Sequence, residues 1–151
     1  MKKLFYSMFA VLALSMSFAA CGSDDDDVST PYSSNPAQSA AGTYTGTWTR
    51  TQVGETTQET AEGTLTIEAT DTYAGKVTFT AAGFSLAASS VTNISFDSDG
   101  YSFYNQLATN GIGAKFAGKI SQGKTATVGF TLSQRVGRKL YEYKYEFIGN
   151  K

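Results

Sequence analysis

From residue 42 to the C-terminal end, apolar and polar residues alternate with a period of two. This alternation is typical of β-strands that bury one face and expose the other. It is clearest near the end of the chain, where aromatic residues alternate with charged ones, the aromatic positions being Tyr141, Tyr143, Tyr145 and Phe147. The expected strands cover residues 42–50, 64–68, 76–80, 84–88, 92–96, 101–103, 114–120, 125–134 and 141–147.

The connections between these segments are short, and many contain glycine. The turn pairs are Asp99-Gly100, Asn110-Gly111, Gln122-Gly123 and Val136-Gly137. Glycine adopts the positive φ angles that tight hairpin turns require, whereas parallel pairing would need crossovers of a dozen residues or more. We therefore predict an all-β fold, an antiparallel meander of eight to nine strands. Closure into a barrel is expected because it removes the two open sheet edges.

Residues 1–20 have the features of a signal peptide. Lys2 and Lys3 precede an apolar run that is too short for a membrane span and ends at Ala19-Ala20-Cys21. This site resembles the lipobox of bacterial lipoprotein precursors, in which the cysteine becomes the first mature residue and carries acyl chains. The alternative is an ordinary secretory signal. Cys21 is the only cysteine and has no partner for a disulfide within the chain, which favours lipid attachment and a membrane partner.

An acidic run follows the cysteine directly. It consists of Ser23, Asp24, Asp25, Asp26 and Asp27. The run resembles the export signal of surface lipoproteins in Bacteroidetes, which implies a lipid-anchored protein of the outer membrane, exposed on the cell surface. The alternative is a solvated, self-repelling spacer. Residues 28–41 contain both prolines and no apolar period, so we expect a lipidated tether and linker over 21–41 and a barrel domain over 42–151.

A motif on the first expected strand points to a barrel family. Gly46-Thr47-Trp48 matches the Gly-x-Trp motif of lipocalins and the wider calycin group, and residues 42–47 resemble the first strand of calycin-like β-barrel lipoproteins of Bacteroidetes. The resemblance implies a barrel that binds a small apolar or amphipathic molecule in its mouth. It also implies that a late arginine, Arg135 or Arg138, packs across Trp48. The lipocalin disulfide and C-terminal helix have no counterpart in this sequence.

The aromatic residues of the expected barrel either fill its lumen or line a ligand pocket. The candidate ligand-binding residues are Tyr44, Trp48, Phe103, Phe116, Tyr143 and Tyr145. An eight-stranded barrel is just wide enough to be filled by side chains or to hold one small ligand. An open aromatic pocket would favour a small hydrophobic ligand. A packed lumen with exposed tyrosines would favour an adhesion module that contacts a glycan or a partner protein.

The composition offers little for catalysis. The chain has no histidine, so it lacks the usual general base near neutral pH and the commonest metal ligand. Residues 42–151 contain ten Lys and Arg against nine Asp and Glu, a balance that is not typical of nucleic-acid binding. Glu59, Glu62 and Glu68 are expected on a solvated strand face. We predict a protein that is not an enzyme, with no cofactor, no metal and no nucleic-acid partner.

Two motif matches are interpreted as turns. Residues 118–125 fit the P-loop pattern, but the residues that follow are β-branched and alternate, whereas a P-loop requires a helix there. Residues 97–100 resemble half of a calcium loop and lack its remaining ligands. Both segments are expected to join neighbouring strands.

Overall fold

The computed structural model describes residues 34–109, 112–121 and 124–151. These residues belong to one compact unit, Pro31–Lys151. Cys21 and the acidic run from Ser23 to Asp27 lie outside the described residues, so the lipid-attachment and export predictions are not tested by the structure.

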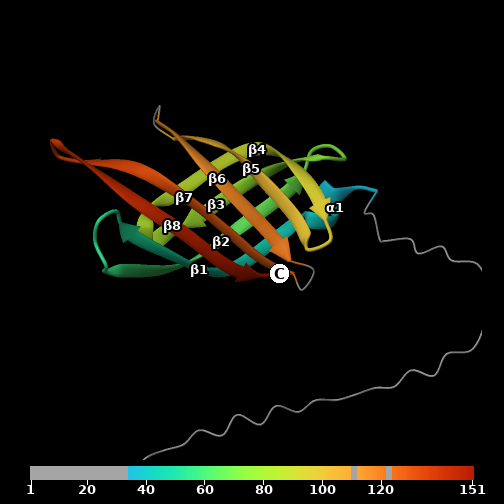
Figure 1. Ribbon diagram of the computed structural model, residues 1–151, viewed down its shortest axis with the longest axis horizontal. Coiled ribbons are helices and arrows are strands. Elements are labelled where there is room, and N and C mark those ends of the chain that lie inside the picture. Colours follow the sequence, from blue (N-terminus) through green and yellow to red (C-terminus); the bar gives the residue numbers. More distant parts are fainter. Residues whose placement is uncertain (1–33, 110–111, 122–123) are drawn as a thin grey trace, which may run out of the picture. The chain divides into compact units, whose positions relative to one another are not determined.

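Eight antiparallel strands form a closed barrel in chain order, with the last strand pairing back to the first (Figure 1). They are β1 (Gly42–Gln52), β2 (Gln58–Ala69), β3 (Ala74–Ala81), β4 (Leu86–Asp97), β5 (Gly100–Thr109), β6 (Ile112–Ser121), β7 (Thr125–Val136) and β8 (Lys139–Asn150). A short helix α1 (Pro36–Ala40) precedes β1, and a 3-10 turn η1 (Ala82–Phe84) lies between β3 and β4. The predicted all-β, closed antiparallel barrel is confirmed, and Thr125 begins a strand, as the hairpin interpretation of residues 118–125 requires.

The number of strands is eight because residues 86–88 of one expected segment and all of another, 92–96, belong to the single strand β4, whereas Phe84 ends the 3-10 turn η1 and Ser85 caps it. The inward positions of β4 include the polar residues Ser90 and Thr92, so the sequence pattern indicated two short strands in place of one. Ser90 Oγ donates to the carbonyl oxygen of Gln106 at 3.1 Å, and Thr92 Oγ1 donates to that of Tyr104 at 2.8 Å. These bonds link β4 to β5 at positions beyond the last backbone pair, Asn93 with Tyr104.

The prediction of a linker up to residue 41 is wrong for residues 36–40, which form α1. The Asn35 side chain accepts from the Gln38 backbone N–H at 3.0 Å, and Pro36 occupies the first turn, where its missing N–H costs nothing. Ala37 and Ala40 are fully buried against the barrel core. One helical turn with small buried residues leaves no apolar period in the sequence, so the domain begins earlier than expected.

The two ends of the barrel differ. At the end where α1 lies, the chain closes over the lumen, whereas at the opposite end two hairpins separate (Figure 1). Pairing between β6 and β7 stops at Phe116 with Phe130, and pairing between β1 and β8 stops at Gln52 with Tyr143. The β7–β8 hairpin therefore extends past both neighbouring strands.

Candidate functional site

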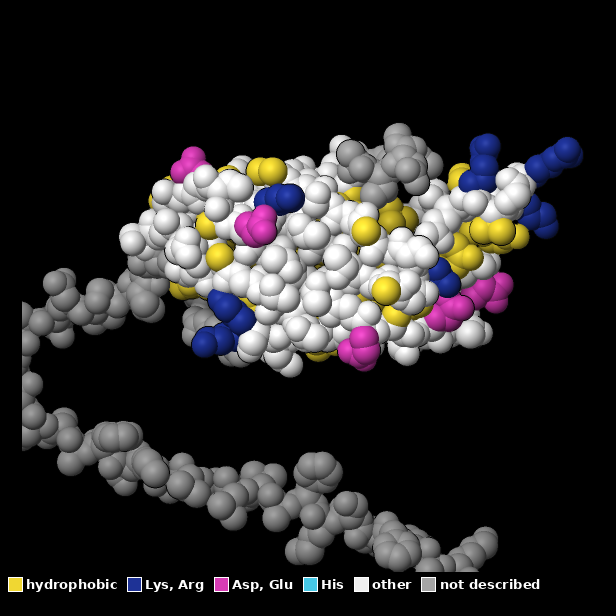
Figure 2. Space-filling view, turned by 180° about the vertical axis from the view of Figure 1, so that it is seen from behind, with side chains coloured by type: hydrophobic (Ala, Val, Ile, Leu, Met, Phe, Trp, Pro, Cys, Tyr) yellow, Lys and Arg dark blue, Asp and Glu magenta, His cyan; other side chains and the backbone are white. Residues whose placement is uncertain are grey.

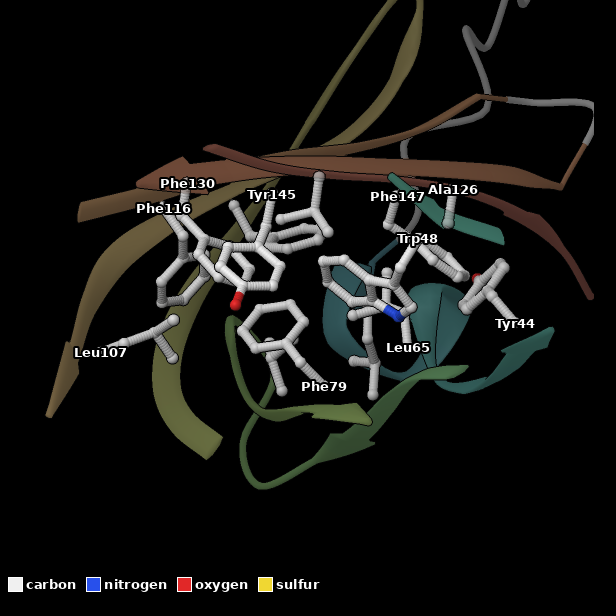
Figure 3. Packing of buried hydrophobic residues seen from close by; sticks show 14 of the residues in the cluster. Tyr44, Trp48, Leu65, Phe79, Leu107, Phe116, Ala126, Phe130, Tyr145 and Phe147 are labelled. Carbon is white, nitrogen blue, oxygen red and sulfur yellow. The ribbon is translucent and has the colours of Figure 1, made fainter. Parts of the chain in front are cut away.

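Aromatic rings fill the middle of the lumen (Figure 3). Trp48 is fully buried, and its ring centroid lies 5.9 Å from that of Phe79, 5.5 Å from Phe130 and 5.0 Å from Phe147. Phe79 in turn meets Phe116 edge-on at 5.2 Å. Edge-on and tilted contacts at these distances are favourable for aromatic pairs. The rings therefore contact one another across the space that a lumenal ligand would need.

Most of the predicted ligand-binding residues belong to this core. The buried ones, each at most 2% exposed, are Tyr44, Trp48, Phe103, Phe116 and Tyr145. Tyr143 differs, because it is half-buried at the end of the barrel opposite α1. The structure thus brings five of the six together as packing partners, and their role in binding a ligand stays a prediction.

Two polar atoms in the described part of the lumen lack a hydrogen-bond partner. They are Trp48 Nε1 and Tyr145 Oη. The indole lies so close to Gly63 that a Cβ there would be 2.6 Å from Trp48 Cδ1 and 2.9 Å from Nε1. Gly63 therefore provides the space for the Trp48 ring. Trp48 Nε1 is a group to which a buried water could bind, whereas Tyr145 Oη lies near the Arg50 guanidinium, whose pKa it helps to raise.

The α1 end of the lumen is closed by a hydrogen bond to the helix. Tyr44 Oη donates to the buried carbonyl oxygen of Ala40 at 2.8 Å. Burial, and secondarily the nearby Tyr101, raise the pKa of Tyr44 above its ordinary value. Beside this contact is a pocket of about 270 Å³, here called the mouth pocket. Its lining residues are Ser39, Tyr44, Phe96, Tyr101, Ile120, Ser121, Lys124 and Lys151.

At the opposite end, Arg50 is held between two aromatic rings. Its Cζ lies 4.6 Å from the ring centroid of Phe84 and 4.9 Å from that of Tyr143. Arg50 Nε donates to Glu59 Oε2 at 2.8 Å. Burial lowers the pKa of Arg50, but the interactions with Glu59 and Tyr145 together outweigh it, and the net pKa shift is upward. Glu59 itself is exposed, but its register places it on the same strand face as Ala61 and Leu65, so the expectation of an outward, solvated strand face is wrong for this residue, which is exposed at the end of the barrel opposite α1.

The implied packing of Arg135 or Arg138 across Trp48 is wrong. Both arginines are exposed at the tip of the β7–β8 hairpin. Trp48 pairs with Phe147, whereas Arg135 pairs with Leu140. That separation along β8 corresponds to about 23 Å at the usual rise of a strand, so neither arginine can cover the indole.

A groove crosses the outer face of β5, β6 and β7. This outer groove has a volume of about 520 Å³ and is lined by Tyr104, Asn105, Gln106, Lys115, Phe116, Ala117 and Gly129. A second depression of about 450 Å³ shares Ala117 and Gly129 with it and continues to Glu146 on β8. The outer groove and this adjoining depression, treated together as the outer groove from here on, combine an aromatic ring, amides, an ammonium group and a carboxylate.

The strand register explains why the surface is hollow at this point. Tyr104 pairs with Ala117, Ala117 with Gly129, and Gly129 with Glu146. Two small residues thus lie side by side between a tyrosine and a glutamate. Since neighbouring strands are 4.7–4.9 Å apart, the backbones of Tyr104 and Glu146 are about 14 Å apart across the floor. This row of four residues places a tyrosine on one side of the floor and a glutamate, ion-paired with Lys144 at 2.7 Å, on the other.

The outer groove was missed in the sequence. A usable signal was the adjacent pair Phe103-Tyr104, because neighbouring aromatic residues on a strand face opposite sides. Phe103 is buried and Tyr104 is 77% exposed. A single exposed tyrosine is common on protein surfaces, so the informative feature is its pairing with the small residue Ala117, which alternation alone does not give.

Within residues 34–109, 112–121 and 124–151, no cluster of three or more Cys, Asp or Glu side chains is arranged to hold a metal ion. Among the same described residues, no helix has the length and hydropathy needed to cross a bilayer.

Comparisons with known proteins give one informative similarity. No protein-family model matches the chain, and no curated protein matches it. The structure is similar to the crystal structure of a "putative outer membrane protein" from Bacteroides fragilis NCTC 9343, with a TM-score of 0.58 and 13% sequence identity. The similarity covers 78% of this chain and 53% of that one, so the chain spans about half the length of the matched protein. At this identity the similarity concerns the fold alone.

Proposed function

We propose that the chain is a lipid-anchored outer-membrane protein whose packed barrel binds a glycan in the outer groove. The observation that carries the proposal is the row of Tyr104, Ala117, Gly129 and Glu146. A tyrosine ring offers an apolar face for the C–H side of a sugar, and a carboxylate accepts hydrogen bonds from neighbouring hydroxyls. The small floor residues leave room for a sugar ring between them.

The filled lumen supports this proposal over carriage of a small hydrophobic molecule. A ligand in the middle of the barrel would have to displace Trp48 or Phe79, both fully buried. The loss of a large aromatic side chain from a core costs about 3–5 kcal/mol. A ligand that binds on the outer face leaves this core untouched.

The membrane part of the proposal rests on the lipobox and on the outer-membrane description of the similar Bacteroides fragilis structure. The outward face of the barrel carries Thr, Glu and Lys side chains, whereas barrels that span membranes carry an apolar band outward. The proposed attachment is therefore through acyl chains on Cys21, since two or more chains hold a protein stably on a bilayer. Cys21→Ala should abolish fatty-acid labelling and release the domain, and label that persists on this variant would contradict the anchor.

Surface exposure is proposed from the acidic run. Replacement of Asp24 to Asp27 by Ala should leave the protein lipidated but protected from protease added to whole cells. Equal protease sensitivity of both forms would show that the acidic run is only a spacer and not an export signal.

The glycan site is tested on the compact unit Pro31–Lys151. Its binding to a panel of neutral and acidic oligosaccharides is measured by calorimetry, with folding checked by circular dichroism. Tyr104→Ala and Glu146→Gln should each weaken binding about tenfold or more, as expected for loss of one good polar or stacking contact. Gly129→Leu should abolish it, because the side chain would fill the floor.

The matched control is Tyr73→Ala. Tyr73 is also an exposed tyrosine, at 62%, but it does not line the outer groove. Its replacement should leave binding unchanged. Absence of saturable binding across the panel, or full binding by the folded Gly129→Leu variant, would exclude the groove as a glycan site.

The mouth pocket supports a second candidate function, binding of a small acidic amphiphile. Its aromatic lining and the ammonium groups of Lys124 and Lys151 suit an apolar body with a carboxylate. Its volume of about 270 Å³ is slightly below the usual range for ligand pockets, which ranks it second. Saturable binding of a fatty acid to the wild-type domain, lost on Lys124→Ala and kept on Gly129→Leu, would favour this site.

A further inference from the structure

The tip of the β7–β8 hairpin is both basic and apolar. Arg135, Arg138 and Lys139 surround the turn, and no ion pair is recorded for them with any described residue. Val136 and Leu140 lie between them and are 61% and 58% exposed. Figure 2 shows basic and apolar side chains together at the end of the barrel from which this hairpin projects.

Within the described residues, the tip pairs with no strand outside its own hairpin. The last such contact of β8 is at Glu142, whose carbonyl oxygen accepts from the Val53 backbone N–H at 2.8 Å, and β7 pairs with β6 only up to Phe130. Three residue pairs of the hairpin, from Gln134 with Tyr141 to Val136 with Lys139, therefore project past the barrel by about 10 Å. This length matches the 5–10 Å to which interfacial protein elements enter the headgroup region of a bilayer.

The basic and apolar residues share both faces of the hairpin. Arg135 pairs with Leu140 on one face, and Val136 pairs with Lys139 on the other. A partner that docks on one face of the hairpin would contact only half of these side chains. A partner that surrounds the tip would contact all of them.

We infer that this hairpin tip inserts into the interface of an anionic lipid membrane. Such an interface supplies negative headgroups for the three basic residues and an apolar layer for Val136 and Leu140. An acidic glycan would satisfy the charges but would leave the two apolar side chains in water. Charge complementarity and exposed apolar area therefore favour lipid over glycan at this surface.

The length of the preceding chain allows the tip to reach the membrane that holds the lipid anchor. Cys21 and Pro36 are 15 residues apart, a contour length of up to about 50 Å. The 12 residues of β8 span about 40 Å, so a domain tethered at its α1 end can turn its opposite end to the same bilayer. This step alone rests on the proposed anchor, and the tip's lipid binding does not depend on the outer groove.

The test uses the compact unit Pro31–Lys151, which lacks the proposed lipid, and flotation with vesicles. Vesicles of phosphatidylcholine alone are compared with vesicles that also contain phosphatidylglycerol. The wild-type domain should bind only the anionic vesicles, and added salt should release it. Combined Arg135→Gln, Arg138→Gln and Lys139→Gln should lower the partition coefficient roughly a hundredfold, at about fivefold for each basic residue. Val136→Ser with Leu140→Ser should lower it at least tenfold, although the charge is unchanged.

The matched control removes the same charge away from the tip and outside the mouth pocket. Lys76→Gln, Lys119→Gln and Lys144→Gln together should change the partition coefficient less than threefold, since charges more than a Debye length from the surface contribute little. Equal losses for the two triple variants would overturn the assignment of the tip. Failure of the wild-type domain to bind anionic vesicles, or binding to heparin alone that persists in the Val136→Ser, Leu140→Ser variant, would also overturn it.

Discussion

The lumen and the outer groove are the two sides of the same strands, and each contains a glycine. On the inward side, Phe103 pairs with Gly118, which pairs with Val128. On the outward side, one residue further along, Tyr104 pairs with Ala117 and Ala117 with Gly129. The two glycines have opposite surroundings, because a Cβ at Gly118 would meet Phe103 Cζ at 2.2 Å, whereas a Cβ at Gly129 would meet only a carbonyl oxygen at 3.8 Å.

This difference teaches that a small residue marks a cavity only when no neighbour fills it. Inside the barrel, the Phe103 ring occupies the space that Gly118 leaves. Outside, the Tyr104 side chain is 77% exposed and the groove above Gly129 stays open. The comparison therefore predicts large effects of substitution in the lumen and small effects in the groove.

The largest effect is expected for Trp48→Ala, which removes the centre of the lumenal cluster. The free energy of unfolding should fall by about 3–5 kcal/mol, from lost burial and the cavity left behind. Urea unfolding of the Pro31–Lys151 domain, followed by circular dichroism, measures the change. Tyr104→Ala, on the outer face, should stay within about 0.5 kcal/mol of wild type. A similar loss in both variants would contradict the packed-lumen description.

A smaller loss is expected for Gly118→Ala, because the new methyl group would overlap the buried Phe103 ring. Overpacking of this kind costs about 1–3 kcal/mol. In a Phe103→Leu background the same substitution should cost much less, since the ring that it meets is gone. Equal costs in the two backgrounds, measured by urea unfolding, would show that the contact is not the cause.

The period-two pattern was sufficient to predict the barrel and the inward side of its strands. It also placed Tyr44, Trp48 and Tyr145 on the inward side, where all three are buried. It could not predict whether the lumen is filled, because that depends on rings that cross from opposite strands, such as Phe79 meeting Trp48.

The outer groove depends on register, which the alternation alone does not fix. Ala117 and Gly129 belong to different strands, and only their direct pairing makes a continuous floor. A register shift of one residue would turn one strand's side chains to the other face. Helix α1 was missed for a different reason, since its buried residues, Ala37 and Ala40, are too small to mark a hydrophobic face.

Tyr44→Phe tests how the lumen is closed at the α1 end. Loss of the hydroxyl leaves the buried carbonyl oxygen of Ala40 without this donor, so the free energy of unfolding should fall by about 1 kcal/mol. The raised pKa of Tyr44 adds a pH dependence. The unfolded chain loses this proton near the ordinary value of about 10 while the folded chain still holds it, so the contribution present below about pH 10 is lost as pH rises through the folded pKa.

The measurement is urea unfolding of wild type and Tyr44→Phe from about pH 8 to about pH 11, the range that brackets the ordinary tyrosine pKa. The wild-type domain should lose stability more steeply above about pH 10 than the variant does. The difference between the two proteins isolates Tyr44 from the other tyrosines. Parallel curves would show that ionisation of Tyr44 does not limit folding at high pH.

The smallest effect is expected for Gly129→Ala, the outward counterpart of Gly118→Ala. Gly129 is not among the glycines with positive φ, so alanine adopts its backbone conformation without strain. The added Cβ meets only Tyr145 O, at 3.8 Å, an ordinary van der Waals distance. Removal of a glycine from a strand also reduces the conformational entropy of the unfolded chain, which is stabilising by about 0.4–1 kcal/mol at compatible sites. Gly129→Ala should therefore leave the free energy of unfolding unchanged or slightly raised. A loss as large as that of Gly118→Ala would mean that the groove floor is packed in solution, and the contrast between lumen and groove would fail.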